Sequence, residues 1–457
     1  MNFQNQEDTI CALSSPAGKG AISLIRLSGG HALQIVNSVF SGDILQAASH
    51  TAHFGRIYRN NEILDEVLLT VFRGPASFTG EDTVEIACHG SVYIQQQLLE
   101  LLLEKGARLA GPGEFSLRAY LNGKMDLSQT EAIADLISAG SKAAHRLAMQ
   151  QMRGGFSKEL QELRQSLLDF ASLVELELDF SEEDVEFADR TQLVKLVNEI
   201  KRKVNSLENS FQLGNVIKNG VPVAIVGAPN AGKSTLLNAL LKEEKAIVSD
   251  IAGTTRDVIE DTIVLTGIEF RFIDTAGIRE TKDSIENMGI ERAYKQISNA
   301  QIVLLLIDLS ETDEKTALEQ IAKFRERSIR KEQTFLPLFN KTDRINRADF
   351  ERLSTEGLFI SAKGQINLDR LIERLLQAVH LDESENELIV TNVRHYEILK
   401  KCTLSLGKIE EGLNAQLPGD LLALDIRETL DLLGQITGNV SNDELLGNIF
   451  ANFCIGK

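Results

Sequence analysis

The stretch GAPNAGKS, from Gly227 to Ser234, has residue types and a spacing that suit the binding of a phosphate chain. It satisfies the pattern GxxxxGK[ST] and lies between the apolar run VPVAIVG and the helical pattern STLLNAL. Glycines let backbone N–H groups turn toward phosphate oxygens, Lys233 adds a positive charge at the β and γ phosphates, and Ser234 offers a hydroxyl to Mg²⁺. The residues expected to bind nucleotide here are Asn230, Ala231, Gly232, Lys233, Ser234 and Thr235.

Three companion motifs follow, each at the end of a predicted strand, and they indicate which nucleotide is bound. They are DTAG at Asp274, Thr275, Ala276 and Gly277, NKTD at Asn340, Lys341, Thr342 and Asp343, and SAK at Ser361, Ala362 and Lys363. Asp274 can reach the magnesium shell, and Gly277 can sense the γ phosphate. The Asp343 carboxylate can accept two hydrogen bonds from guanine N1 and N2, which adenine cannot supply. Four motifs in this order predict a GTP-binding domain.

The residue that follows DTAG is Ile278, where a glutamine that positions the attacking water often lies in GTPases. An isoleucine cannot orient water, so another group must do so. Charge that develops in the transition state also needs a donor, and the candidates are Arg256 within GTTRD, Arg279 and Glu286. For Arg279 and Glu286, a solvated loop face is an equally good interpretation of the spacing.

The composition limits what the whole chain can be. A chain of 457 residues should divide into two to four domains. The net charge of −18 argues against a broad, nonspecific grip on nucleic acid, because phosphate binding needs concentrated Lys and Arg. With no membrane-length apolar run and no signal-peptide pattern, a cytoplasmic location is expected. Four widely spaced cysteines without a CxxC pair are expected to be reduced thiols: Cys11, Cys88, Cys402 and Cys454.

Three sequence patterns along the chain predict a multidomain fold. Residues 1–120 alternate short apolar runs with glycines, which indicates an α+β domain. Residues 121–219 and 381–457 carry long helical patterns, and between 220 and 380 strands alternate with helices as in a doubly wound sheet. One helical stripe consists of Leu163, Leu167, Phe170, Val174 and Leu178. The sequence therefore predicts an α+β N-terminal domain and an all-α helical domain that is interrupted by an inserted α/β P-loop GTPase domain.

Taken together, the motifs are specific to one family. The combination of GAPNAGKS, SDIAGTTRD, DTAGIRE, NKTD, SAK and terminal CIGK resembles the MnmE (TrmE) family of bacterial tRNA modification GTPases. The resemblance extends over essentially the whole chain, including DTICALSSPAGKG, FTGEDTVEIACHG and GPGEFSLRAYLNGKMDLSQTEAIADLI. It implies an N-terminal domain that is similar to folate-binding domains.

The resemblance also implies activation by potassium, which supplies the positive charge that an arginine finger would give. The implied potassium ligands are Asn230, Ser249, Ile251 and Thr254, and the implied magnesium ligands are Ser234 and Thr255. Glu286 resembles the glutamate that helps orient the attacking water. The loop implied to line the nucleotide and the cations consists of Ser249, Asp250, Ile251, Ala252, Gly253, Thr254 and Thr255.

For the N-terminal domain, the resemblance implies a 5-formyltetrahydrofolate-type ligand. Arg26 in LIRLSG, Glu85 in GEDTVEIACHG, Lys124 in LNGKMDL and the final Lys457 match the family's folate-contacting positions. Cations suit the glutamate tail of folate, and a carboxylate can accept hydrogen bonds from a pterin ring. By residue type alone, Arg26 and Lys124 would be surface cations and Glu85 a charge on a strand face.

Two features of this implied folate site remain open. Ala21 and Ser23 replace glycines that family members often have, which puts the pocket geometry there in question. In the tail, Gly456 would allow a bend that projects Cys454 toward the folate while Lys457 holds the ligand. Cys454 can be a nucleophile, a general acid or a packing residue, and a cationic neighbour favours its thiolate form.

The resemblance implies a partnership as well as an activity. The chain would form a homodimer through its N-terminal domains and a heterotetramer with the flavin enzyme MnmG (GidA), which would bring FAD and NADH. Together they would add an aminomethyl or carboxymethylaminomethyl group to carbon 5 of the wobble uridine of certain tRNAs. GTP hydrolysis would drive opening and closing of the G domains.

Two other functions are weighed against this one. An Era-like RNA or ribosome-assembly GTPase switch without modification chemistry would need a basic RNA-binding module after SAK, where this chain carries LDESENEL. A folate-dependent one-carbon enzyme with a regulatory GTPase would turn over free folates without tRNA or a partner.

Overall fold

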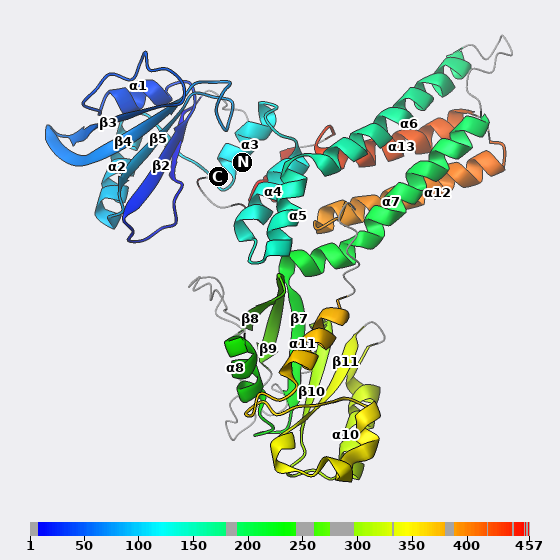
Figure 1. The fold of residues 1–457 in the computed structure, drawn as a ribbon. Coiled ribbons are helices and arrows are strands. Elements are labelled where there is room, and N and C mark those ends of the chain that lie inside the picture. The colour runs from blue at the N-terminus through cyan, green and yellow to red at the C-terminus, as the bar shows by residue number, and fades with distance from the viewer. Residues whose placement is uncertain are drawn as a thin grey trace, which may run out of the picture. The chain divides into compact units, whose positions relative to one another are not determined.

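The computed structural model describes residues 8–179, 190–243, 260–274, 297–330, 333–379, 388–417, 419–440, 443–451, 453 and 456. The chain forms two compact units. One comprises Met1–Ile137, Met149–Arg202 and Ile398–Lys457, and the other comprises Ser138–Ala148 and Lys203–Glu397. The two ends of the chain therefore belong to one unit, and most of its middle belongs to the other (Figure 1).

A mixed sheet forms the N-terminal part of the first unit. Its strands are β1 (Ile10–Leu13), β2 (Ile22–Ser28), β3 (Thr51–Arg59), β4 (Glu62–Phe72), β5 (Thr83–His89) and β6 (Arg108–Leu109), in the order β3-β4-β5-β2-β1-β6. Helices α1 (Ala32–Asn37) and α2 (Val92–Glu104) contribute to one buried cluster with Ile25 and Ile86 of the sheet. Because side chains alternate along a strand, Arg26 and Glu85 point to the other face.

Helices make up the rest of the first unit. They are α3 (Glu114–Leu121), α4 (Leu127–Ser138), α6 (Gly155–Asp179), α13 (Gly419–Thr437) and α14 (Asp443–Phe450). Three further helices have residues in both units: α5 (Lys142–Met152), α7 (Arg190–Asn219) and α12 (Val393–Asn414). The last residue of α4, Ser138, also belongs to the second unit. Leu163, Leu167 and Phe170 of the predicted stripe are buried on α6, which lies beside α13 (Figure 1). The side chains of Val174 and Leu178 lie outside the described residues.

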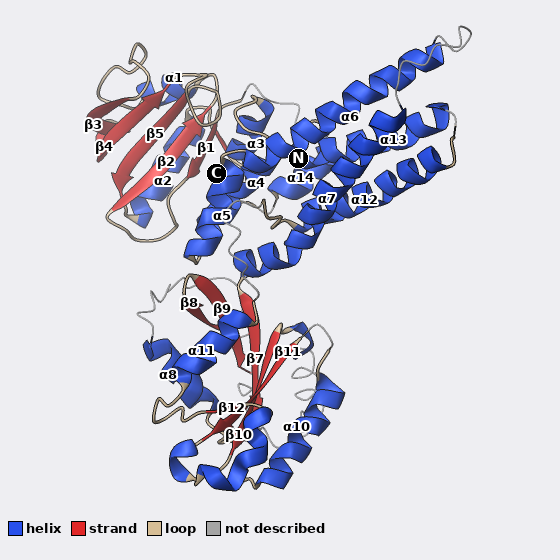
Figure 2. Ribbon diagram, turned by 45° about the vertical axis from the view of Figure 1, so that its right-hand side comes forward, coloured by secondary structure: helices blue, strands red, loops and turns tan. Residues whose placement is uncertain are grey.

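A second sheet forms the α/β part of the other unit, and it is parallel apart from one edge pair (Figure 2). Its strands are β7 (Val221–Gly227), β8 (Glu260–Leu265), β9 (Ile268–Asp274), β10 (Ile302–Asp308), β11 (Thr334–Asn340) and β12 (Leu358–Phe359), in the order β12-β11-β10-β7-β9-β8. Its helices include α8 (Lys233–Glu243), α10 (Glu314–Ser328) and α11 (Leu368–Gln377), with 3₁₀ turns η2 (Thr342–Arg344) and η3 (Arg347–Thr355).

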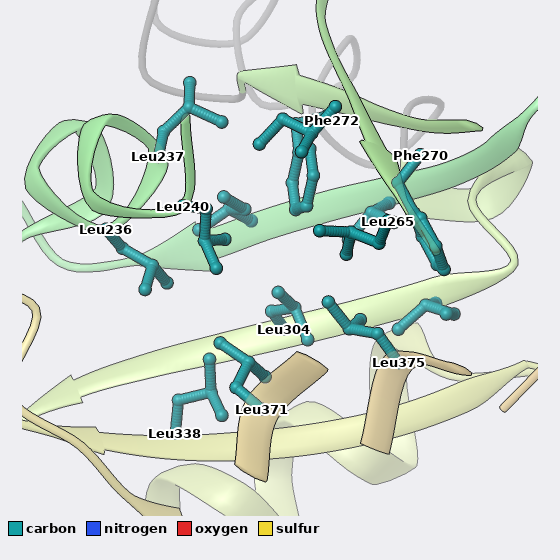
Figure 3. Packing of buried hydrophobic residues seen from close by; sticks show 14 of the residues in the cluster. Leu236, Leu237, Leu240, Leu265, Phe270, Phe272, Leu304, Leu338, Leu371 and Leu375 are labelled. Carbon is teal, nitrogen blue, oxygen red and sulfur yellow. The ribbon is translucent and has the colours of Figure 1, made fainter. Parts of the chain in front are cut away.

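Both faces of this sheet are covered by apolar packing. Figure 3 shows leucines of α8 and α11 packed with Leu304 of β10 and Phe272 of β9. On the opposite face, Leu305 and Ile307 pack with α10. Every residue of β10 is buried, so this strand lies at the centre of the domain. The arrangement confirms the predicted multidomain fold class, and it brings the carboxyl ends of β7, β9, β10 and β11 to one edge.

Candidate functional site

The loop between β7 and α8 has the shape that the sequence predicts for a phosphate-binding loop. Asn230 and Gly232 have left-handed φ angles of 65° and 101°, and α8 begins at Lys233. The ammonium of Lys233 donates to two carbonyl oxygens of the loop, at 2.7 and 3.0 Å. Ser234 and Thr235 are exposed in the first turn of α8, where the backbone N–H groups of a helix can donate to an anion. The backbone of the loop therefore already has a conformation that suits phosphate binding.

Asn340, the last residue of β11, connects the phosphate loop to both base-recognition motifs. Its side-chain amide donates to the carbonyl of Ala231 at 2.7 Å and accepts from the backbone N–H of Ala362 at 3.0 Å. The side chain is buried, so these bonds form away from water. A Cβ at Gly232 would overlap the Asn340 amide, which explains a glycine at that position beyond its positive φ.

The carboxylate of Asp343, which the sequence predicts to bind guanine, is held in place by the SAK loop. Ser361 donates its hydroxyl to Asp343 Oδ1 at 2.5 Å, and Thr342 donates to the carbonyl of Ile360 at 2.9 Å. The hydrogen bond from Ser361 lowers the pKa of Asp343 below its usual value. The carboxylate is therefore ionised at neutral pH, as acceptance of two guanine N–H groups requires. Lys363, the last residue of SAK, is exposed beside it.

Several predicted site residues cannot be placed. Asp274 ends β9, but its side chain lies outside the described residues. Also outside them are the loop from Ser249 to Thr255, the remainder of DTAG with the Ile278 that follows it, and the candidates for hydrolysis: Arg256, Arg279 and Glu286. The implied ligands Asn230 and Ser234 lie in the phosphate loop as expected, whereas the residues that would complete each cation shell stay a prediction.

On the N-terminal sheet, the structure brings Arg26 and Glu85 together. They are direct partners on β2 and β5, and Arg26 contacts Glu85 Oε1 through Nε at 2.9 Å and Nη2 at 2.7 Å. The guanidinium also lies over the rings of Phe78 and Phe115, at 5.4 and 5.7 Å from their centroids. Only 17% of the Arg26 side chain is exposed, so the interpretation of Arg26 as a surface cation is wrong.

Lys124 reaches the segment between β4 and β5 that also carries Phe78. Its ammonium donates to the carbonyl of Pro75 at 2.8 Å, and its hydrocarbon stem lies against Gly80. The side chain remains exposed and close to a segment that contacts Arg26. Lys124 therefore combines the surface exposure expected from residue type with a contact to the segment whose Phe78 lies against Arg26.

The tail meets the same sheet at Gly456. The Ser14 hydroxyl donates to the Gly456 carbonyl at 3.0 Å, and Gly456 is buried with a φ of 97°. A Cβ at this position would overlap the carbonyl of Leu13, the last residue of β1. Because β1 pairs with β2, Gly456 lies one strand away from Arg26. Cys454 and Lys457 lie outside the described residues.

Ala21 and Ser23, which replace glycines common in the family, make hydrogen bonds away from the sheet face that carries Arg26. Ser23 points to the opposite face, where its buried hydroxyl accepts from Gln95 of α2 at 2.7 Å. The carbonyl of Ala21 accepts the backbone N–H of Gly90 at 3.2 Å, which joins two connecting segments.

Sequence reasoning missed four residues at these sites: Ser14, Phe78, Phe115, and Asp308, whose carboxylate pairs with Lys341 of NKTD. Phe78 opens the motif FTGEDTVEIACHG, but nothing in its spacing indicates a contact with Arg26. A signal existed for Asp308, because a carboxylate that ends the apolar run IVLLLID must emerge at the edge where the nucleotide motifs gather.

A phosphate loop and two base-recognition loops on one edge of a doubly wound sheet define a P-loop GTPase. The "MnmE helical domain" family model matches residues 127–454, and "GTP-binding protein TrmE N-terminus" matches residues 9–124. "tRNA modification GTPase MnmE" of Flavobacterium johnsoniae is 55% identical over 99% of both chains. The protein of that name from Cytophaga hutchinsonii is 54% identical over 99% of this chain and 98% of its own. The chain belongs to the MnmE family of tRNA modification GTPases.

Among solved structures, a variant of Era from Aquifex aeolicus bound to GDP.AlF4− is 28% identical over 40% of this chain and 65% of that chain, with a TM-score of 0.28. In the described part of the chain, no helix has both the length and the apolarity to cross a bilayer.

Proposed function

We propose that this GTPase depends on potassium and magnesium. Support comes from the phosphate loop, where Asn230 takes a left-handed conformation beside Lys233 and Ser234. Asn230 with Ser249, Ile251 and Thr254 would hold K⁺, while Ser234 and Thr255 would hold Mg²⁺. The potassium charge would stabilise the transition state, and Glu286 would orient water. GTP turnover in KCl should exceed turnover in NaCl at equal ionic strength; equal rates would remove Asn230 from this role.

The Arg26–Glu85 pair supports a folate-type ligand at the N-terminal sheet, and this observation carries the proposal furthest. Both contacts of Arg26 use Oε1 of Glu85, so Oε2 can accept from a pterin N–H. Phe78 offers an aromatic surface, and Lys124 and Lys457 can neutralise the carboxylates of the glutamate tail. Calorimetry with 5-formyltetrahydrofolate tests this site directly.

The open face of that sheet supports a homodimer. Ile22, Phe54 and Leu68 are 70%, 73% and 45% exposed, and the strand register places them on the face that carries Arg26 and Glu85. A second copy of the chain would cover these side chains. Sedimentation should show a dimer for the native chain and a monomer for Phe54→Glu. Tyr93→Glu is the matched control, because Tyr93 is 65% exposed on α2 instead.

The dimer would act with MnmG on tRNA. The partner would supply FAD and NADH, and the pair would install an aminomethyl or carboxymethylaminomethyl group at carbon 5 of the wobble uridine. The G domain would span residues 220–380, inserted into a helical domain of residues 121–219 and 381–457 that follows an N-terminal domain of residues 1–120. Opening and closing of the G domains during hydrolysis would couple GTP to this chemistry.

Mass spectrometry of wobble-uridine nucleosides from cells that lack the protein tests the whole proposal. Wild type should restore the modified uridine, and Cys454→Ser should fail to restore it while still hydrolysing GTP. If deletion leaves these nucleosides unchanged, the modification chemistry is wrong and an Era-like switch becomes the better description.

A further inference from the structure

An acidic residue outside the nucleotide motifs lies at the guanine-recognition edge. Asp308 ends β10, and the parallel register pairs it with Asn340 at the end of β11. Its carboxylate forms an ion pair with the ammonium of Lys341, the second residue of NKTD. Asp308 is buried, with an exposed fraction of 8%, so its negative charge lies largely away from water.

The carboxylate of Asp308 is also held by Ser310. Its Oδ1 accepts the backbone N–H of Ser310 at 2.9 Å and the Ser310 hydroxyl at 2.6 Å, while Oδ2 faces Lys341. Burial alone would raise the pKa of Asp308, but the bonds from Lys341 and Ser310 outweigh it and hold the pKa below its usual value. The pair is therefore ionic at neutral pH, and loss of Lys341 would leave the buried Asp308 charge with Ser310 as its remaining partner among the described residues.

Lys341 lies between two residues whose side chains are hydrogen-bonded, Asn340 and Asp343. Asn340 is bonded to Ala231 and Ala362, and Asp343 is bonded to Ser361. Lys341 has a left-handed φ of 64°, which turns the chain between them. Its long side chain is the flexible part of this turn, and the contact with Asp308 removes that freedom.

We propose that Asp308 is a positioning residue for guanine nucleotides. It holds the ammonium of Lys341 so that the hydrocarbon stem of the lysine presents a fixed surface to one face of the base, while Asp343 binds the edge of the same base. The lysine rotamer is then ordered before the nucleotide arrives, and binding does not have to order it. This inference rests on the GTPase assignment and concerns binding rather than the hydrolytic step.

A double-mutant cycle tests the inference with fluorescent GDP and with steady-state GTP hydrolysis. Asp308→Ala should weaken GDP binding about tenfold and raise KM far more than it lowers kcat. Asp308→Asn, which keeps the shape and a partner for Ser310, should show a smaller loss. Because Asp308 acts through Lys341, the double variant Asp308→Ala/Lys341→Ala should bind GDP no more weakly than Lys341→Ala alone.

Asp313→Ala is the matched control, because this acid caps the neighbouring helix α10 by accepting the Thr316 N–H at 2.8 Å. It should lower the melting temperature without changing GDP affinity. Additive losses in the double variant would show that Asp308 acts only through the stability of the domain. Native GDP affinity in both Asp308 variants would overturn the inference outright.

Discussion

The guanine site and the N-terminal sheet site both hold a cation against a carboxylate, yet they differ in how completely the chain fixes that pair. Lys341 contacts a buried aspartate that Ser310 also holds, and the neighbouring recognition residues are bonded to one another. Arg26 and Glu85 are 17% and 20% exposed, and their aromatic neighbour Phe78 comes from a connecting segment.

If the sheet binds folate as proposed, this difference corresponds to two ways of preparing a ligand site. The guanine site is assembled at strand ends within one domain, so it is ordered as soon as the sheet folds. The sheet site combines a strand pair with a loop and with the tail, which docks at Gly456 from the far end of the sequence. Its order therefore depends on contacts made late along the chain, and we expect it to respond to changes distant in sequence.

The largest effect is expected from Asp343→Asn at the guanine site. The substitution replaces a charged double acceptor by an amide and should weaken GDP binding about 10²–10³-fold, because two charge-assisted hydrogen bonds are lost. Xanthosine diphosphate, which has a carbonyl where guanine has an amino group, should bind better to the variant than to wild type. Folate binding should not change, and a parallel loss of both ligands would contradict the separation of the two sites.

At the sheet site, Arg26→Ala should weaken folate binding about 10–100-fold, because a charge-assisted contact is lost and the largely buried Glu85 loses its partner. Arg56→Ala is a matched control on the same sheet, since Arg56 pairs with Glu66 at 2.9 Å with both side chains about half exposed. The control should leave folate affinity unchanged. Calorimetry on both variants checks this, and equal losses would mean that general sheet charge matters rather than the pair.

A smaller effect is expected where the tail meets the sheet. Gly456→Ala forces a side chain into a buried left-handed position against the Leu13 carbonyl. The tail should then lose its contact with Ser14, and folate affinity should fall about tenfold. Gly407→Ala is the control, because Gly407 lies in α12 with open space around it. That change should stabilise the protein by about 0.5–1 kcal/mol and leave folate binding intact. Unchanged folate affinity in Gly456→Ala would remove the tail from the site.

The two sites also differ in how far the sequence predicts them. The guanine motifs are contiguous and each ends a strand, so Asn340, Asp343 and Ser361 could be placed from spacing and parallel-sheet topology. The pairing of Arg26 with Glu85 depends on which strands are neighbours, and the order β4-β5-β2-β1 does not follow the chain order. By residue type, Arg26 therefore resembled a surface cation. The contact of Ser14 with Gly456 joins opposite ends of the sequence, and no local pattern indicates it.

The last and smallest effect concerns the thiols. All four cysteines belong to the unit that contains the N-terminal sheet, and the G domain has none. Cys11, Cys88 and Cys402 are free and buried, and burial raises their pKa values to about 11, 11 and 12. At pH 8 a thiol with a pKa of about 11 is thiolate in only about one part in a thousand, so alkylation of these three should be slow. Raised pKa values also mean that their contribution to stability is complete below pH 9 and falls as pH rises toward 11.

Iodoacetamide labelling followed by peptide mass analysis checks this expectation. In the native chain at pH 8, rapid labelling should be confined to Cys454, the one remaining cysteine, and added folate should slow it if the tail takes part in that site. GDP, which binds the cysteine-free domain, is the matched control ligand. Rapid labelling of Cys11 or Cys88 would instead show that the N-terminal sheet opens readily. The contrast between the guanine site and the proposed folate site would then extend to the stability of the sheet itself.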